Sequence, residues 1–164
     1  MAQKTSAPAG ATNRTSGLLK VVVPALTNKP DLPVGSPTFV AALVLRLGGA
    51  GLLAYMGYIH LYLWDQFYKA LPTNGPLFII DAITAFVLTL AVLAVGRAIT
   101  GLVSAIFVAS TLFALVISLE VGLFGFQETI TGPDVVTALT IESIAVVVLL
   151  AWAALLAWAV PRHS

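Results

Sequence analysis

Four long apolar segments, separated by short polar ones, follow an initial polar region of the chain. They cover about residues 38–63, 77–95, 99–123 and 134–160. About 20 residues are enough to cross a hydrocarbon core of roughly 30 Å at 1.5 Å per residue, and each segment reaches that length. The pattern therefore predicts an all-α fold, a four-helix transmembrane bundle that occupies residues 38–160.

Local signals mark the ends of these helices. Ser36 is a suitable cap for the first helix, and Pro37 fits its first turn. Turn-forming Gly and Pro residues occur at 73–76 and 131–133, and a very short turn at 96–97 joins the second and third segments. We therefore expect consecutive helices to run antiparallel to each other.

Residues 1–37 are rich in Ala, Ser, Thr, Pro and Gly, and no apolar core follows their first basic residues as a secretory signal would require. They are predicted to form a flexible cytoplasmic tail. The apolar patch at 18–26 either stays weakly ordered, lies on the membrane surface or docks on a partner. Residues 161–164 are predicted to form a cytoplasmic C-terminus.

Basic residues gather on one side of the predicted bundle. On that side are Lys4, Arg14, Lys20, Lys29, Arg97 and Arg162. The other side has Lys69, which Asp65 offsets, and then the acids Glu128 and Asp134. Because cytoplasmic loops of membrane proteins carry an excess of Lys and Arg, both termini are predicted to be cytoplasmic. The two longer loops are then outside.

Composition narrows the possible partners. Of 164 residues, 59% are hydrophobic and 9% are charged, so most of the surface must face lipid or other protein. The net charge of +1 and the lack of a dense Lys/Arg cluster argue against nucleic acid. The chain has no Cys, which excludes disulfides, thiolate metal sites and iron–sulfur clusters. The expected partners are the bilayer and other membrane subunits or further copies of the chain.

Five ionisable residues fall within the predicted spans: Arg46, His60, Asp81, Glu120 and Glu142. Such residues are costly in lipid, so they usually face the bundle interior, water or an interface. Arg46 lies in the inner half, where it either extends to the interface or pairs inside the bundle. The other four are predicted to meet in the outer half, with Glu142 slightly deeper. They form either a ligand or proton site, or a set of acids solvated at the interface.

Aromatic residues concentrate near the outer end of the first helix. Tyr58, Tyr62 and Trp64 are typical of the belt that anchors a helix at the membrane interface. The same residues are also a candidate aromatic wall for a lipid or quinone pocket.

The third helix carries a row of small residues that favours close helix packing. They are Gly101, Ser104, Ala105, Ser110, Thr111 and Ser118.

Motifs for established chemistry are missing. The predicted spans hold one imidazole and no Glu-x-x-His pair, which argues against a metal centre, and a haem held by two imidazoles needs a second His in the spans. No Ser-His-Asp order, phosphate loop or nucleotide motif occurs. We predict no catalytic residue and no metal ligand, favour a protein that is not an enzyme, and leave the cofactor open.

The two halves of the bundle share a pattern. Each has an ionisable residue followed four positions later by an aromatic one, then a Gly-Pro turn and a helix with one acid, Asp81 or Glu142. Two duplicated hairpins are one explanation, and chance similarity between apolar helices is the other.

Three segments, YIHLYLW at 58–64, GPLF at 75–78 and VGLFGFQE at 121–128, resemble small four-span actinobacterial membrane proteins of unassigned function. The resemblance extends over about residues 46–142 and implies a bacterial cytoplasmic (inner) membrane protein. The chain is more weakly similar to the DoxX-like membrane family, through an Arg-Leu pair at 46–47 and the glycines after it. That family is linked to redox and quinone-associated complexes.

These patterns lead to two main hypotheses. The first is a non-catalytic accessory subunit of a larger respiratory or transport complex in the membrane. The alternative is a small quinone-, lipid- or ion-binding membrane protein with a polar site in its outer half. A proton-coupled carrier, which would have to dimerise, remains a third.

Overall fold

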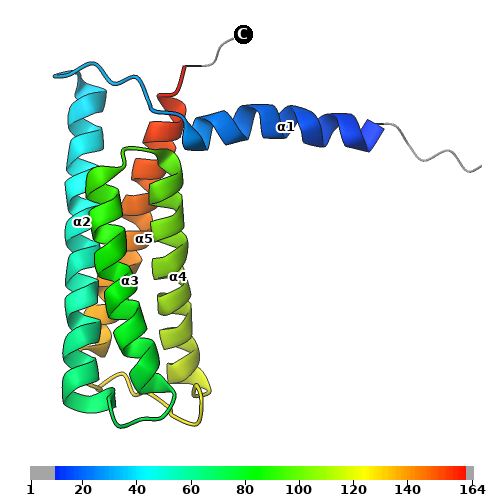
Figure 1. Ribbon diagram of the computed structural model, residues 1–164. Coiled ribbons are helices and arrows are strands. Elements are labelled where there is room, and N and C mark those ends of the chain that lie inside the picture. The colour runs from blue at the N-terminus through cyan, green and yellow to red at the C-terminus, as the bar shows by residue number, and fades with distance from the viewer. Residues whose placement is uncertain (1–9, 162–164) are drawn as a thin grey trace, which may run out of the picture.

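The computed structural model describes residues 10–161, which form five α-helices and one π-helical turn (Figure 1). The elements are α1 (Gly10–Thr27), α2 (Pro37–Leu63), η1 (Trp64–Tyr68), α3 (Asn74–Ala94), α4 (Ala98–Glu120) and α5 (Val135–Trp158). The first residues of the predicted tail, 1–9, and most of the predicted C-terminus, 162–164, lie outside the described part.

Helices α2 to α5 form one bundle, which confirms the predicted all-α architecture. The spans Pro37–Tyr68, Asn74–Ala94, Ala98–Glu120 and Val135–Trp158 have 32, 21, 23 and 24 residues, and each is long and apolar enough to cross a membrane. Large apolar side chains cover the outside, for example Leu90 and Val147, which are both 67% exposed. This surface suits acyl chains, and the chain is a multi-pass membrane protein.

The predicted helix starts are correct to within a few residues. Ser36 Oγ accepts a hydrogen bond of 3.1 Å from the backbone N–H of Phe39, and Pro37 is the first residue of α2. Helix α3 begins at Asn74, three residues earlier than predicted, and its first turn includes Pro76. Proline is tolerated there since its missing N–H would have no partner within the helix.

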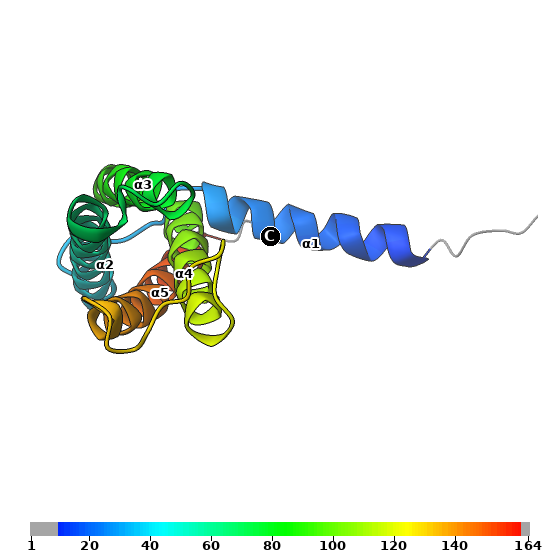
Figure 2. The same cartoon turned by 90° about the horizontal axis from the view of Figure 1, so that it is seen from below.

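Helix α1 differs from the predicted flexible tail. It runs sideways, away from the end of the bundle, in both views (Figures 1 and 2). Its last turns contact α4 and α5, and Leu26 packs on the bundle core. The Asp31 N–H then donates to the Ala159 carbonyl over 3.2 Å. Pro24 and the Gly, Thr, Ser and Asn residues have low helix propensity, so the sequence alone did not indicate this helix.

The four spans follow each other around a ring in the order α3, α2, α5, α4 (Figure 2). Helix α2 packs on α3 and α5, and α4 packs on α5. Of the four neighbouring pairs in the ring, α3 and α4 make the smallest contact. Gly101 lets α4 approach α5, because a Cβ at Gly101 would be 2.9 Å from Trp152 Cε3. Small residues therefore set one tight helix contact, as the sequence predicted.

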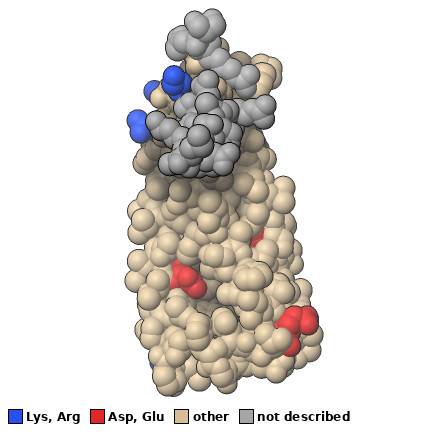
Figure 3. Space-filling model, turned by 90° about the vertical axis from the view of Figure 1, so that its right-hand side faces the viewer, with Lys and Arg blue, Asp and Glu red and all other residues tan. Residues whose placement is uncertain are grey.

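We call the end of the bundle that holds η1 and residues 121–134 the distal end, and the opposite end the α1 end. On the face shown in Figure 3, Lys and Arg atoms gather beside α1, and acidic atoms lie in the distal half. Basic residues thus lie mainly at the α1 end and acidic residues mainly in the distal half, which is the charge distribution that the sequence predicted.

Candidate functional site

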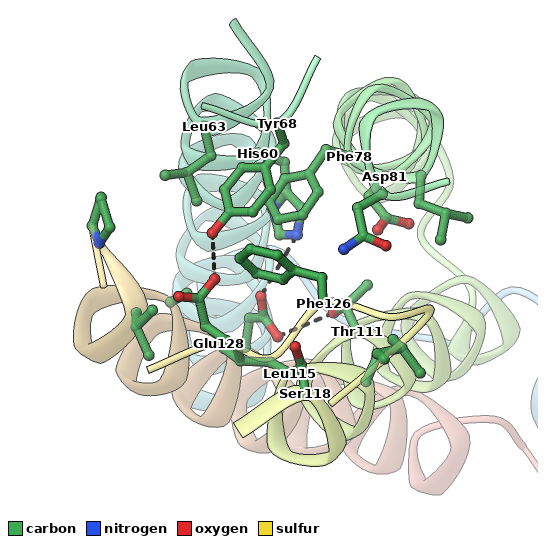
Figure 4. A pocket seen from close by; sticks show the side chains of 18 residues that line it. His60, Leu63, Tyr68, Phe78, Asp81, Thr111, Leu115, Ser118, Phe126 and Glu128 are labelled. Atoms are coloured by element: carbon green, nitrogen blue, oxygen red, sulfur yellow. Dashed lines mark hydrogen bonds and ion pairs between the residues drawn. The ribbon is translucent and has the colours of Figure 1, made fainter. Parts of the chain in front are cut away.

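A cavity of about 110 Å³ lies at the distal end, between the four spans and residues 121–134 (Figure 4). A single water needs roughly 10–15 Å³ measured in this way, so the cavity has room for several waters or a small organic group. Its polar lining residues are His60, Tyr68, Asn74, Asp81, Thr111, Ser118, Glu128 and Glu142.

His60, on α2, is 8% exposed and presents one free nitrogen to this cavity. Its Nδ1 lies 3.0 Å from the Met56 carbonyl oxygen. A carbonyl oxygen only accepts hydrogen bonds, so Nδ1 carries the hydrogen. In the neutral ring Nε2 is then an acceptor. It lies 3.9 Å from Glu142 Oε1, too far for a direct hydrogen bond.

Glu142, on α5, is 2% exposed, and Thr111 on α4 is its hydrogen-bond partner. Thr111 Oγ1 lies 3.1 Å from Glu142 Oε2 and 2.8 Å from the Val108 carbonyl oxygen. A hydroxyl has one hydrogen, and the Val108 carbonyl can only accept it. Both contacts are therefore complete when Glu142 is protonated and donates to Thr111. A protonated carboxyl group also avoids the cost of an unpaired buried charge.

Asp81, on α3, is half-buried and lines the same cavity. It follows the first residue of α3, Asn74, by seven residues, as Glu142 follows Val135 in α5. Both acids thus lie about 10 Å along their helices from the distal end, at 1.5 Å per residue. The sequence predicted a deeper Glu142, and the early start of α3 removes that difference.

The predicted aromatic wall does not line the cavity. Tyr58 and Tyr62 are 56% and 42% exposed on the outside of α2, where their rings stack at 6.3 Å. Trp64 is also absent from the lining. Residues 58 and 62 are four apart and share a helix face, whereas His60 lies between them on another face.

Three other rings form the aromatic wall instead, and Figure 4 shows them beside His60. The rings of Tyr68 and Phe78 stack with centroids 4.3 Å apart, and Phe126 meets Tyr68 edge-on at 5.6 Å. Tyr68 follows His60 by eight residues, a spacing that returns to the same helix face. The first helix predicted from the sequence ends at residue 63, whereas in the structure the π-turn η1 continues it to Tyr68.

Residues 121–134 cover the distal side of the cavity. The Tyr68 hydroxyl donates to Glu128 Oε2, and the Glu128 N–H donates to the Ser118 carbonyl over 3.1 Å. These bonds join the loop to η1 and to α4. Glu128 was predicted only as an outer-loop acid, and its place in the cavity depends on the loop conformation.

Glu120, the fourth predicted residue, does not join the site. It is exposed at the C-terminal end of α4 and does not line the cavity. Thr111 and Ser118, seven residues apart, face the cavity, and Glu120 lies two residues further, on a different side of the helix. The structure thus brings together His60, Asp81 and Glu142 and leaves Glu120 outside.

Arg46 lies far from the cavity, in the α1 half, and pairs inside the bundle. Its Nε donates to the Val92 carbonyl over 2.9 Å, and its Nη2 donates to the Leu93 carbonyl. These carbonyls belong to the last turn of α3, where backbone C=O groups have no partner within the helix and carry partial negative charge. Arg46 therefore joins α2 to the end of α3, a structural task.

Within residues 10–161, no three His, Asp or Glu side chains lie close enough together to hold a metal ion. Comparison with known proteins adds no assignment, since no protein-family model, curated protein or solved structure matches this chain. The likeness of residues 46–142 to small actinobacterial membrane proteins and the weaker similarity of the first helix to the DoxX-like family stay predictions.

Proposed function

We propose that this chain is a small ligand-binding protein of the bacterial cytoplasmic membrane, with the distal cavity as its site. The observation that carries the proposal is a pair of polar atoms, His60 Nε2 and Glu142 Oε1. They lie 3.9 Å apart in deeply buried side chains, and neither has a hydrogen-bond partner among the described residues. Both residues line the cavity, so a ligand atom or a water placed there can bond to both atoms at once.

The surroundings of the pair favour a molecule that partitions into the membrane. Tyr68, Phe78 and Phe126 give the cavity flat apolar walls, and Thr111 and Ser118 supply hydroxyl groups. A polar head with an apolar body matches such a lining. A quinone, a lipid head group and an ion are the classes that the sequence predicted.

The proposal is tested by calorimetric titration of the chain in lipid nanodiscs. Two probes are used, menadione, which is a neutral quinone, and benzyltrimethylammonium, which is a cation. At least one is expected to bind the wild type with one-to-one stoichiometry. Ala114→Phe fills the cavity and should abolish that binding, whereas Val116→Phe, on the exposed side of α4, should preserve it. No binding of either probe, or full binding by Ala114→Phe, would contradict the proposal.

We also propose that the α1 end is cytoplasmic, which corresponds to the N-in, C-in topology. Arg46 and Arg97 at that end, and the acids at the distal end, support this orientation. The chain has no Cys, so single cysteines can be labelled without background. A membrane-impermeant maleimide should label Gln127→Cys on intact cells and Lys29→Cys only after lysis. The reverse pattern would refute the topology.

A second candidate function, an accessory subunit of a larger membrane complex, is favoured by α1. Residues Leu19, Val21, Val22 and Val23 are 46–58% exposed on a helix that leaves the bundle. Such a surface suits a partner subunit. Purification in mild detergent should then recover a defined complex that Val22→Asp dissociates. A monomer with nothing bound would exclude this function.

A further inference from the structure

The charges of the distal cavity restrict its ligand. Asp81, Glu128 and Glu142 contribute three carboxyl groups, and no Lys or Arg occurs among the described residues that line it. His60 donates from Nδ1 to the Met56 carbonyl, and as a neutral ring it adds no positive charge and keeps Nε2 as an acceptor. A phosphate or carboxylate head group would meet carboxyl groups and no basic side chain there, so the lining selects against anions.

The aromatic walls select in the same direction. The faces of aromatic rings attract cations through their quadrupole, most strongly where water is excluded. Tyr68 and Phe78 use one face each for their stack at 4.3 Å, and Phe126 meets Tyr68 edge-on at 5.6 Å. All three rings line the cavity together with the carboxyl groups (Figure 4). Carboxyl groups together with an aromatic wall are the combination that binds ammonium groups.

We infer that the cavity takes an organic cation, an amine or quaternary ammonium with an apolar body, which replaces the proton of Glu142. This inference rests on the proposed function and names the ligand class. The O–H bond of the Glu142 carboxylic acid breaks, its electron pair stays on oxygen, and the proton leaves to solvent. The carboxylate then pairs with the ammonium, so the net charge of the cavity is the same before and after exchange.

The exchange follows from the burial of Glu142, which is 2% exposed. A buried carboxylate is stable only with a counter-charge, so the proton and the cation exclude each other. Before exchange the proton lies between Glu142 Oε2 and Thr111 Oγ1, which are 3.1 Å apart, and Glu142 Oε1 faces His60 Nε2 at 3.9 Å.

Four other titratable side chains line the cavity together with Glu142, one each from α2, η1, α3 and the covering loop. They are His60 from α2, Tyr68 from η1, Asp81 from α3 and Glu128 from the covering loop, whereas α4 presents the hydroxyls of Thr111 and Ser118.

The test uses the full chain in nanodiscs and two probes of the same shape. Benzyltrimethylammonium carries the charge, and neopentylbenzene replaces its nitrogen with carbon. The cation should bind at least about tenfold more tightly than the hydrocarbon. Titration in two buffers of different ionisation enthalpy should show release of up to one proton per bound cation. Equal affinity for both probes, or binding without proton release, would overturn the inference.

Variants of the acids sharpen the test. Glu142→Gln keeps the shape and the bond to Thr111, and should weaken cation binding at least about tenfold and abolish proton release. Glu120→Gln is the matched control, because Glu120 is exposed outside the cavity, and it should bind as the wild type does. Wild-type binding by Glu142→Gln would overturn the inference.

Asp81→Asn keeps the test decisive if Glu142→Gln fails to fold. It should weaken cation binding and preserve proton release, because Asp81 adds charge to the site without being the proton donor. Wild-type affinity in Asp81→Asn would overturn the inference.

Failure of the inference is distinguishable from failure of the proposed function. If menadione alone binds, and Ala114→Phe blocks it, the inferred cation specificity is refuted, and the proposal that the cavity is a ligand site stands. Binding of neither probe would refute both.

Discussion

His60 and Glu142 face each other across 3.9 Å from helices α2 and α5, and each is held from behind by one hydrogen bond. The Met56 carbonyl fixes the imidazole, and Thr111 fixes the carboxyl group. Both side chains are thus oriented before any ligand arrives, so binding does not have to order them. Such preorganisation lowers the entropic cost of association.

Loss of the Thr111 hydroxyl should destabilise the bundle. Thr111→Val leaves the buried Glu142 without its side-chain partner, at an expected cost of about 1–3 kcal/mol in the free energy of unfolding. Denaturant unfolding in mixed micelles measures it. Thr140→Val is the control, because Thr140 is exposed and bonds only to its own helix at Val136. Equal stability of the two variants would show that the Thr111 contact contributes nothing.

Arg46→Leu should weaken the joint between α2 and α3. It removes both donors to the carbonyls of Val92 and Leu93, and bonds from a charged donor contribute about 1.5–3 kcal/mol each. Arg46→Lys should recover part of the loss, since an ammonium keeps the charge without the planar fork. The same unfolding assay applies. A Leu variant as stable as the wild type would contradict the structural role of Arg46.

Two glycines give a matched pair for helix packing. A Cβ at Gly101 would lie 2.9 Å from Trp152 and 3.1 Å from Ala153 Cβ, whereas a Cβ at Gly51 meets nothing within 4 Å. Gly101→Ala should therefore cost about 1–3 kcal/mol by overpacking. Gly51→Ala should be neutral or slightly stabilising, since alanine is the better helix former. The reverse order of stability would show that α4 and α5 do not pack as described.

Tyr68→Phe should loosen the loop over the cavity. The variant keeps the ring stack with Phe78 and loses the bond to Glu128. Backbone hydrogen exchange in residues 121–132 should rise about tenfold, because roughly 1.4 kcal/mol of closure is lost. Tyr58→Phe, on the exposed face of α2, should leave exchange in the loop unchanged. Unchanged exchange in Tyr68→Phe would mean that this bond does not hold the loop.

The sequence was sufficient to predict the four spans, because each is a continuous apolar run between turn residues. It also indicated that His60, Asp81 and Glu142 would meet, since charged groups avoid lipid. It did not show which side of each helix faces inward. Helices that are apolar all round have no hydrophobic stripe to mark the buried face, and Glu120 was misplaced for that reason.

The aromatic wall and α1 were missed for different reasons. Tyr68 reaches the cavity because the helix continues through the π-turn η1, a feature without a sequence signature. Helix α1 depends on contacts with α4 and α5 rather than on its own propensity. The duplication of two hairpins stays a prediction. Asp81 and Glu142 lie equally far from the starts of their helices, whereas His60 and Glu120 do not occupy equivalent places.

The connection between α3 and α4 has a mechanical consequence. It consists of three residues, Val95 to Arg97, and its Arg97 N–H donates to the Val95 carbonyl over 3.0 Å. The two helices are thus held together at one end, and along their length they make the smallest contact of the four neighbouring helix pairs. A helix of this size is a lever of about 30 Å, so a tilt of about 5° at the pivot displaces its free tip by roughly 3 Å. Any change in the angle between α3 and α4 would therefore alter the width of the bundle most at the distal end, where the cavity lies.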